Sequence, residues 1–127
     1  MKKLMIYLFG IVLLGTACYP TEAQELLSPK EFQAKIDKDT DAQVVDVRTA
    51  QEYNSGHVKG AICIDYYDKD FRNLAKKNLD KTKWVYIYCK RGSRSARANA
   101  ILKDLGFRVI ELQGGIMNWL TQGLPVE

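Results

Sequence analysis

Two patterns of apolar residues alternate along this chain of 127 residues. Short runs of consecutive apolar residues are typical of strands that are buried on both faces. They predict strands at 44–47, 61–64, 84–88 and 107–112. Between the runs, apolar residues recur at the spacing of one helix face. This second pattern predicts helices at 29–37, 50–55, 71–79, 96–105 and 116–120.

Strands that alternate with helices predict an α/β fold. We expect a mainly parallel central sheet with helices on both faces. The chain is long enough for one domain with a modest core. In open sheets of this kind, ligands bind beyond the carboxyl ends of the strands. Residues that directly follow a strand are therefore the first candidates for function.

Two sequence signals mark the starts of helices. Ser28 and Glu31 form a capping box around Pro29, a residue that suits the first helical position. Thr49 and Glu52 repeat the capping-box pattern before the second helix. Both signals predict helix starts that do not depend on the apolar pattern.

The first residues carry the pattern of an export signal. Lys2 and Lys3 precede an almost wholly apolar segment, 4–14, which is too short to span a bilayer as a stable helix. We therefore expect residues 1–23 to be a signal peptide and residues 27–127 to form the domain. The mature protein is expected outside the cytoplasm, either periplasmic or lipid-anchored to the envelope.

Two cleavage sites fit this signal, and both remain open. A cut after Ala23 follows the small-residue spacing of ordinary signal peptidase sites. A cut after Ala17 makes Cys18 the mature N-terminus and a candidate for lipid attachment, although Gly15 stands where that motif prefers an aliphatic residue. Membrane contact is expected only through such a lipid, and residues 18–26 are expected to form a tether.

The net charge does not favour nucleic acid as a partner. The formal charge is +4, and it becomes +3 when residues 1–23 are removed with their two lysines and one glutamate. The exception is local, because a cluster of cations follows Cys89 with no acid among them. A charge run is usually only a solvated face, but this one adjoins a cysteine at the end of a predicted strand. The cations are Lys90, Arg91, Arg94 and Arg97.

Cys89 lies where the predicted strand 84–88 turns into the start of a helix. A helix N-terminus and nearby cations bind anions and favour the thiolate, the reactive form of cysteine. Gly92 permits a tight turn, and Arg94 can hold an oxyanion in fork geometry. Cys89 is therefore the candidate nucleophile for a small anionic substrate. The residues expected to bind that substrate are Lys90, Arg91, Gly92, Ser93, Arg94 and Ser95.

The spacing between the nucleophile and the arginine narrows the choice of substrate. Cysteine phosphatases separate the two by five residues, whereas Cys89 and Arg94 are separated by four, Lys90 to Ser93. The smaller loop suits a single sulfur on the cysteine better than a phosphoryl group. Phosphatase or arsenate reductase activity is therefore disfavoured.

Four motifs in order resemble the rhodanese family of sulfurtransferases. They match its patterns D-V-R…E-[FY], G-H-[IV]-x-G-A, C-x-x-G-x-R-S and L-x-G-G-x-x-x-W. In this sequence they are Asp46-Val47-Arg48 with Glu52-Tyr53, Gly56-His57-Val58-Lys59-Gly60-Ala61, Cys89-Lys90-Arg91-Gly92-Ser93-Arg94-Ser95, and Leu112-Gln113-Gly114-Gly115 with Trp119. The resemblance covers about residues 27–127 and implies a single-domain rhodanese fold.

The resemblance implies covalent catalysis in two half-reactions. Cys89 would accept a sulfane sulfur from a donor such as thiosulfate and pass it from a persulfide to cyanide or a thiol. No metal and no organic cofactor is implied. Asp46, Arg48, Glu52 and His57 are implied to be structural. His57, the only histidine, invites the role of a base, but a cysteine that is already a thiolate needs none.

Two questions stay open at the level of sequence. The protein could instead be a persulfide carrier or thiol redox protein that acts on a protein partner; a non-catalytic binding module is disfavoured because Cys89 and its cations are present. Cys63 is expected to be a small core residue in a buried strand. Its alternative role, as a resolving thiol for Cys89, requires the two Cα atoms to lie within disulfide reach.

Overall fold

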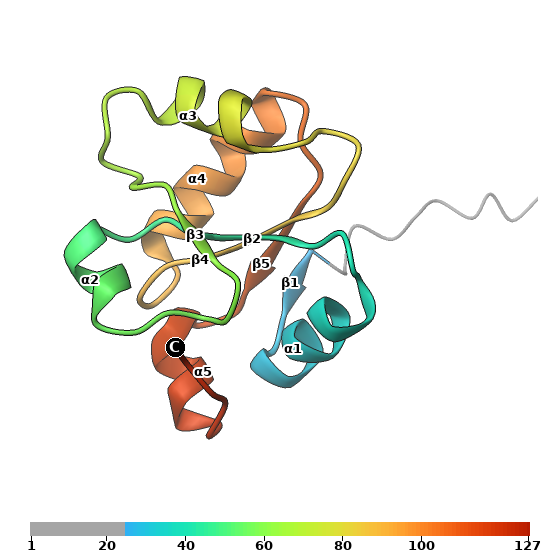
Figure 1. Cartoon of the computed structure of the whole chain (residues 1–127), viewed down its shortest axis with the longest axis vertical. Coiled ribbons are helices and arrows are strands. Elements are labelled where there is room, and N and C mark those ends of the chain that lie inside the picture. Colours follow the sequence, from blue (N-terminus) through green and yellow to red (C-terminus); the bar gives the residue numbers. More distant parts are fainter. Residues whose placement is uncertain (1–24) are drawn as a thin grey trace, which may run out of the picture.

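The computed structural model describes residues 25–127, so the predicted signal peptide, both cleavage sites and Cys18 lie outside the described residues. Within them, five strands form one sheet with helices on both sides (Figure 1). The strands are β1 (Leu26–Leu27), β2 (Gln43–Asp46), β3 (Ile62–Cys63), β4 (Val85–Tyr88) and β5 (Val109–Leu112). The helices are α1 (Pro29–Lys38), α2 (Ala50–Asn54), α3 (Phe71–Asn78), α4 (Ser93–Asp104) and α5 (Gly115–Thr121).

The sheet is wholly parallel, with the strand order β1-β5-β4-β2-β3. Strand β4 lies in the middle, and all four of its side chains are buried. Its register places Ile87 beside Val45 of β2 and Val85 beside Val109 of β5. The predicted α/β fold with a mainly parallel sheet is confirmed.

Apolar side chains cover both faces of the sheet. On one face, Ile87 of β4 joins a cluster with Leu102 of α4 and with residues of α3. On the other face, Tyr86 contacts the ring of Phe32 of α1, which in turn contacts Trp119 of α5, both pairs edge to face. Figure 1 shows α3 and α4 on one side of the sheet and α1 and α5 on the other.

Both predicted N-caps are present, although each glutamate accepts from the capping hydroxyl and not from the backbone N–H of a full capping box. The hydroxyl of Ser28 accepts a hydrogen bond from the Glu31 N–H at 3.4 Å and donates to the Glu31 carboxylate at 3.0 Å. The Thr49 hydroxyl makes the same two contacts with Glu52, at 3.3 and 3.2 Å. Pro29 occupies the first position of α1, as expected.

Three predictions about elements were wrong. Residue 26 belongs to β1 rather than to a tether, and two residues are too few to show a strand pattern. Strand β3 lies at the sheet edge, so it is not buried: Ile62 is exposed and Cys63 is half-buried. Helix α4 begins at Ser93 rather than at residue 96, because the polar residues of its first turn follow Gly92, which carries no helix signal. Within residues 25–127, every helix is too short or too polar to cross a membrane.

A buried hydrogen-bond network joins the centre of the sheet to the segment before β3. The Tyr88 hydroxyl donates to Asp46 Oδ2 at 2.8 Å and accepts from the Val58 N–H at 3.0 Å. Burial and then the Asp46 charge raise the pKa of Tyr88, so the hydroxyl stays protonated and can donate. The phenol therefore satisfies two buried polar groups at once.

We expect Tyr88→Phe to destabilise the fold, because it leaves Asp46 Oδ2 and the Val58 N–H short of a partner. The expected loss in free energy of unfolding is about 1–3 kcal/mol, measured by urea denaturation. The matched control is Tyr86→Phe, whose hydroxyl bonds only the half-buried Asp39. If the two variants lose equal stability, the buried network is not the cause.

Candidate active site

Cys89 is the first residue after β4, at the carboxyl edge of the sheet. The chain turns there through Gly92, whose φ of +116° lies in the left-handed region, and then enters α4. A Cβ on Gly92 would meet no atom within 4 Å, so glycine is favoured by backbone conformation and not by crowding. The site thus lies where ligands bind in open parallel sheets.

The sulfur of Cys89 is held by the start of α4. The Gly92 N–H donates to Sγ at 3.0 Å, and the Ser95 Oγ lies 3.4 Å from Sγ. The Cys89 residue is only 1% exposed. An N–H donor at a helix N-terminus stabilises negative charge on the sulfur, so the arrangement suits a thiolate or a persulfide anion.

Helix α5 supports the Cys89 loop from the other side. Its Ile116 N–H donates to Cys89 O at 2.9 Å, and its Met117 N–H donates to Lys90 O at 3.1 Å. A Cβ on Gly115 would lie 2.4 Å from Lys90 O, closer than any real contact. Glycine at this position is therefore required by the close approach of two backbones, in addition to its φ of +64°.

The guanidinium of Arg94, which was expected to bind substrate, is paired with another side chain. Its two terminal nitrogens donate to the two carboxylate oxygens of Glu52, at 2.7 and 2.9 Å. The pair is largely buried, with side-chain exposures of 14% and 29%, and the ring of Tyr67 lies 5.9 Å from the guanidinium. Arg94, predicted to bind substrate, is thus paired with Glu52, predicted to be structural. The pair links α4 to α2.

The other residues expected around the substrate lie in different environments. Lys90, Arg91 and Ser93 are exposed, whereas Ser95 is fully buried against the sulfur. The exposed cations provide a positive field above the loop without contacting the sulfur directly.

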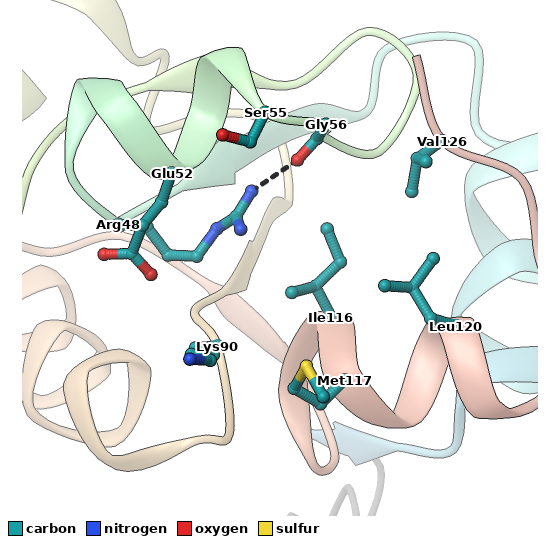
Figure 2. A pocket seen from close by; sticks show the side chains of 9 residues that line it. All are labelled: Arg48, Glu52, Ser55, Gly56, Lys90, Ile116, Met117, Leu120 and Val126. Atoms are coloured by element: carbon teal, nitrogen blue, oxygen red, sulfur yellow. Dashed lines mark hydrogen bonds between the residues drawn. The ribbon is translucent and has the colours of Figure 1, made fainter.

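Among the residues predicted to be structural, Asp46 and Arg48 pair with each other, whereas His57 has other partners. Asp46 accepts three hydrogen bonds from Arg48 side-chain nitrogens, the shortest at 2.7 Å. Arg48 Nη2 also donates to Gly56 O at 2.7 Å, as Figure 2 shows. The ring of His57 stacks on Tyr53 at 3.8 Å, and its Nδ1 lies 3.0 Å from Tyr53 O. His57 thus has partners of its own, none of which is Cys89.

Cys63 is not the small core residue that we expected. It is half-buried in the edge strand β3, and its thiol donates to Arg48 O at 3.4 Å. Burial, followed by the nearby Asp46 carboxylate, raises the pKa of the Cys63 thiol. The prediction failed because an apolar run does not distinguish an edge strand from a central one.

One functional candidate was missed from the sequence. Glu111 of β5 is buried beside the Cys89 loop, where it accepts a hydrogen bond from Ser95 Oγ at 2.8 Å and one from Asn99 Nδ2 at 3.3 Å. The available signal was a carboxylate inside an otherwise apolar strand. Among residues 25–127, no three His, Cys, Asp or Glu side chains are placed to hold a metal ion.

A pocket of about 290 Å³ opens beside the loop. Figure 2 shows apolar side chains of α5 and the C-terminal segment on one side, and the polar side chains of Arg48 and Glu52 on the other. Lys90, the residue that follows Cys89 in the chain, also lines the pocket. The lining residues are Arg48, Glu52, Ser55, Gly56, Lys90, Ile116, Met117, Leu120 and Val126.

The Glu52–Arg94 pair predicts a pH-dependent stability. The hydrogen bonds from Arg94 lower the pKa of Glu52 from 4.5 to about 2. Because the pKa is lower in the folded state, the pair stabilises the fold above pH 4.5, and this contribution is lost as the pH falls towards 2. Glu52→Gln should lower the free energy of unfolding at neutral pH by about 1–2 kcal/mol, allowing for solvent screening.

Urea denaturation at several pH values would test this expectation. The difference between Glu52→Gln and the unaltered protein should shrink as the pH falls from 4.5 towards 2. Asp104→Asn, which breaks the exposed pair with Arg72, should change stability little at any pH. A Glu52→Gln effect that stays constant over this range would contradict the assignment.

Comparison with known proteins agrees with this geometry. The Rhodanese-like domain model matches residues 28–122. A rhodanese-related protein from Thermoplasma volcanium has a similar structure, with a TM-score of 0.72 at 28% identity over 81% of this chain and 97% of that one.

Two named relatives are larger proteins. The chain is 40% identical to a tRNA uridine(34) hydroxylase of Cytophaga hutchinsonii over 76% of its own length and 32% of the relative. It is 36% identical to the probable adenylyltransferase/sulfurtransferase MoeZ of Mycobacterium tuberculosis, over 78% of this chain and 25% of that protein. The chain thus spans about a third or less of these relatives. The family match, the fold and the Cys89 loop together place this chain in the rhodanese-like domain family.

Proposed function

We propose that this protein is a sulfurtransferase that carries a sulfane sulfur on Cys89. The observation that supports this most directly is the Cys89 sulfur at the start of α4, with the Gly92 N–H at 3.0 Å and the Ser95 hydroxyl at 3.4 Å. A nucleophilic sulfur with an N–H donor at this distance can hold one more sulfur atom as an anion.

The first half-reaction uses a small anionic donor such as thiosulfate. The Cys89 thiolate attacks the outer sulfur of thiosulfate and forms a new S–S bond. The S–S bond of the donor breaks, and sulfite leaves with the electron pair. The negative charge then resides on the terminal sulfur of the Cys89 persulfide, where N–H donors of the loop stabilise it.

The second half-reaction returns the enzyme to its starting state. A thiophile, either cyanide or a thiol, attacks the terminal sulfur, and the persulfide S–S bond breaks to regenerate the Cys89 thiolate. Lys90 and Arg91, exposed around the loop, attract anionic donors and thiophiles to it. A direct role of Arg94 in holding an oxyanion requires its pair with Glu52 to open.

The larger relatives are proteins of which this chain spans about a third or less. The tRNA uridine(34) hydroxylase of Cytophaga hutchinsonii is about three times as long as the matched segment. The net charge of +4 is modest for a nucleic-acid partner. Small sulfur compounds and thiols therefore remain the proposed substrates.

The second candidate is a persulfide carrier or thiol redox protein that serves a protein partner. The pocket beside Lys90 favours this second function. Exposed apolar side chains of Met117, Leu120 and Val126 line the pocket and could contact a docked protein partner. The two functions differ in which acceptor discharges the Cys89 persulfide faster, cyanide or a protein thiol.

We further propose that the protein acts outside the cytoplasm, because its first 23 residues carry the export pattern. Cell fractionation and the mass of the mature N-terminus test this proposal. A mature chain that begins at Cys18 with an attached lipid identifies a lipoprotein, and one that begins at Gln24 identifies a soluble form. A full-length cytoplasmic protein would overturn it.

Thiosulfate:cyanide sulfurtransfer should depend wholly on Cys89. Thiosulfate treatment should add one sulfur to Cys89, seen by mass spectrometry of its peptide, and Cys89→Ser should abolish both the adduct and thiocyanate formation. Cys63→Ser is the matched control and should keep both, because its thiol bonds Arg48 O at the sheet edge. Activity that survives in Cys89→Ser, or rapid hydrolysis of an aryl phosphate, would reject the proposal.

A further inference from the structure

Glu111 is a buried carboxylate without a counter-ion. It is 8% exposed in the sheet, and among residues 25–127 no Lys, Arg or His side chain forms an ion pair with it. The other buried carboxylate, Asp46, is paired with Arg48. Removing a carboxylate from water without a cation costs several kcal/mol.

A donor chain leads from the sulfur to this carboxylate. The Cys89 thiol donates to Ser95 Oγ at 3.4 Å, and Ser95 Oγ donates to Glu111 Oε1 at 2.8 Å. The serine has a single proton, and its other acceptor, Gly92 O, is farther away at 3.2 Å. The hydrogen bonds therefore run in one direction, from the thiol to Glu111.

We propose that Glu111 is the proton acceptor for Cys89, acting through the hydroxyl of Ser95, an inference that rests on the sulfurtransferase function proposed above. It replaces the expectation from the sequence that Cys89 needs no base, because the Cys89 thiol donates a hydrogen bond to Ser95 Oγ. The thiol S–H bond breaks as its proton moves to Ser95 Oγ. The original proton of Ser95 moves at the same time to Glu111 Oε1. A thiol and a carboxylate become a thiolate and a carboxylic acid, with no other reactant.

The transfer moves the negative charge from Glu111 to Cys89, where more groups stabilise it. At Glu111 the charge is buried, and its two donors are the neutral side chains of Ser95 and Asn99. At Cys89 the charge receives the Gly92 N–H and lies at the start of α4 beside exposed cations. The oxygen Asn99 Oδ1 is also buried without a hydrogen-bond partner among the described residues, so this site has a surplus of acceptors. A proton on Glu111 reduces that surplus.

After the transfer, the hydrogen bonds between Glu111, Ser95 and Cys89 run in the opposite direction and stabilise the anion. Protonated Glu111 donates to Ser95 Oγ, and the Ser95 proton points at the sulfur. The thiolate, and later the persulfide, gains a second donor beside the Gly92 N–H. Glu111 is thus a positioning residue that controls which way the Ser95 hydroxyl points.

No other ionisable group takes the place of Glu111. From α4 it faces Ser95 and Asn99, and one turn further Lys103 is paired with Glu25. The β5 strand is flanked there by Ile87 of β4 and Leu26 of β1, both apolar.

Arg94, the cation of the first turn of α4, is engaged by Glu52. Lys90 and Arg91 are exposed and form no ion pair with Glu111 within residues 25–127. The relay therefore depends on Cys89, Ser95 and Glu111.

The test is a pH titration of the thiolate ultraviolet absorbance between about pH 4 and 9. Each variant is read against the same protein carrying Cys89→Ser, which isolates the Cys89 signal from Cys18, Cys63 and the tyrosines. Glu111→Leu, which can neither take the proton nor donate to Ser95, should raise the pH midpoint of thiolate formation by about one unit or more, a ~10-fold loss of thiolate below the midpoint. The rate of sulfur addition from thiosulfate should fall by ~10-fold or more at about pH 6.

Ser95→Ala keeps Glu111 but removes the bridge. It should raise the midpoint as well, and adding Glu111→Leu to it should change nothing further, because the two residues act as one unit. Glu31→Gln, which removes one carboxylate at a capping box that tolerates glutamine, is the matched control and should leave the midpoint unchanged. Thermal melts check that each variant is folded.

A Glu111→Leu midpoint that is unchanged, or that moves to lower pH, would overturn the relay. The downward shift is what a carboxylate produces when it acts only by repelling the thiolate. If the midpoints move as expected but thiosulfate adds no sulfur to Cys89, the relay stands and the proposed sulfurtransferase function fails.

Discussion

Two backbone hydrogen bonds from α5 hold the turn on which the site depends. The N–H groups of Ile116 and Met117 bind the carbonyl oxygens of Cys89 and Lys90. In a planar trans peptide the N–H points away from the C=O, so these bonds turn the next two N–H groups of the loop away from α5. The contact requires a backbone with no side chain at Gly115, where a Cβ would lie 2.4 Å from Lys90 O. The closing glycines and the cysteine loop are therefore one structural unit, although they are far apart in sequence.

The two buried carboxylates of the described chain have different physical roles. Asp46 is paired with Arg48 and bonded by Tyr88, so its charge is compensated on every side and it joins β2 to β4. Glu111 has only the neutral donors of Ser95 and Asn99. A compensated charge stabilises one structure, whereas an uncompensated charge next to a thiol provides a place for a proton. The fold thus places structural charge on one side of β4 and reactive charge on the other.

The sequence predicted the alternation of helices and strands because the core residues repeat with clear periods. It also predicted both helix N-caps, since a cap depends on residues only three positions apart. It failed at β1, which has two residues, and at β3, whose apolar run lies at the sheet edge with Ile62 exposed. These errors share one cause: strand order is decided by long-range pairing, and no local pattern records it.

The sequence by itself determined the parallel α/β fold, the family and the place of Cys89 at a strand end followed by a glycine turn. Those features depend on local spacing and on short motifs. Only the tertiary structure decided the partners of the site residues. It paired Arg94 with Glu52, left His57 stacked on Tyr53, and brought Glu111 to Ser95 from 16 positions away. Such contacts form between separate elements across the sheet edge, so their geometry follows from how the strands are ordered and the helices packed.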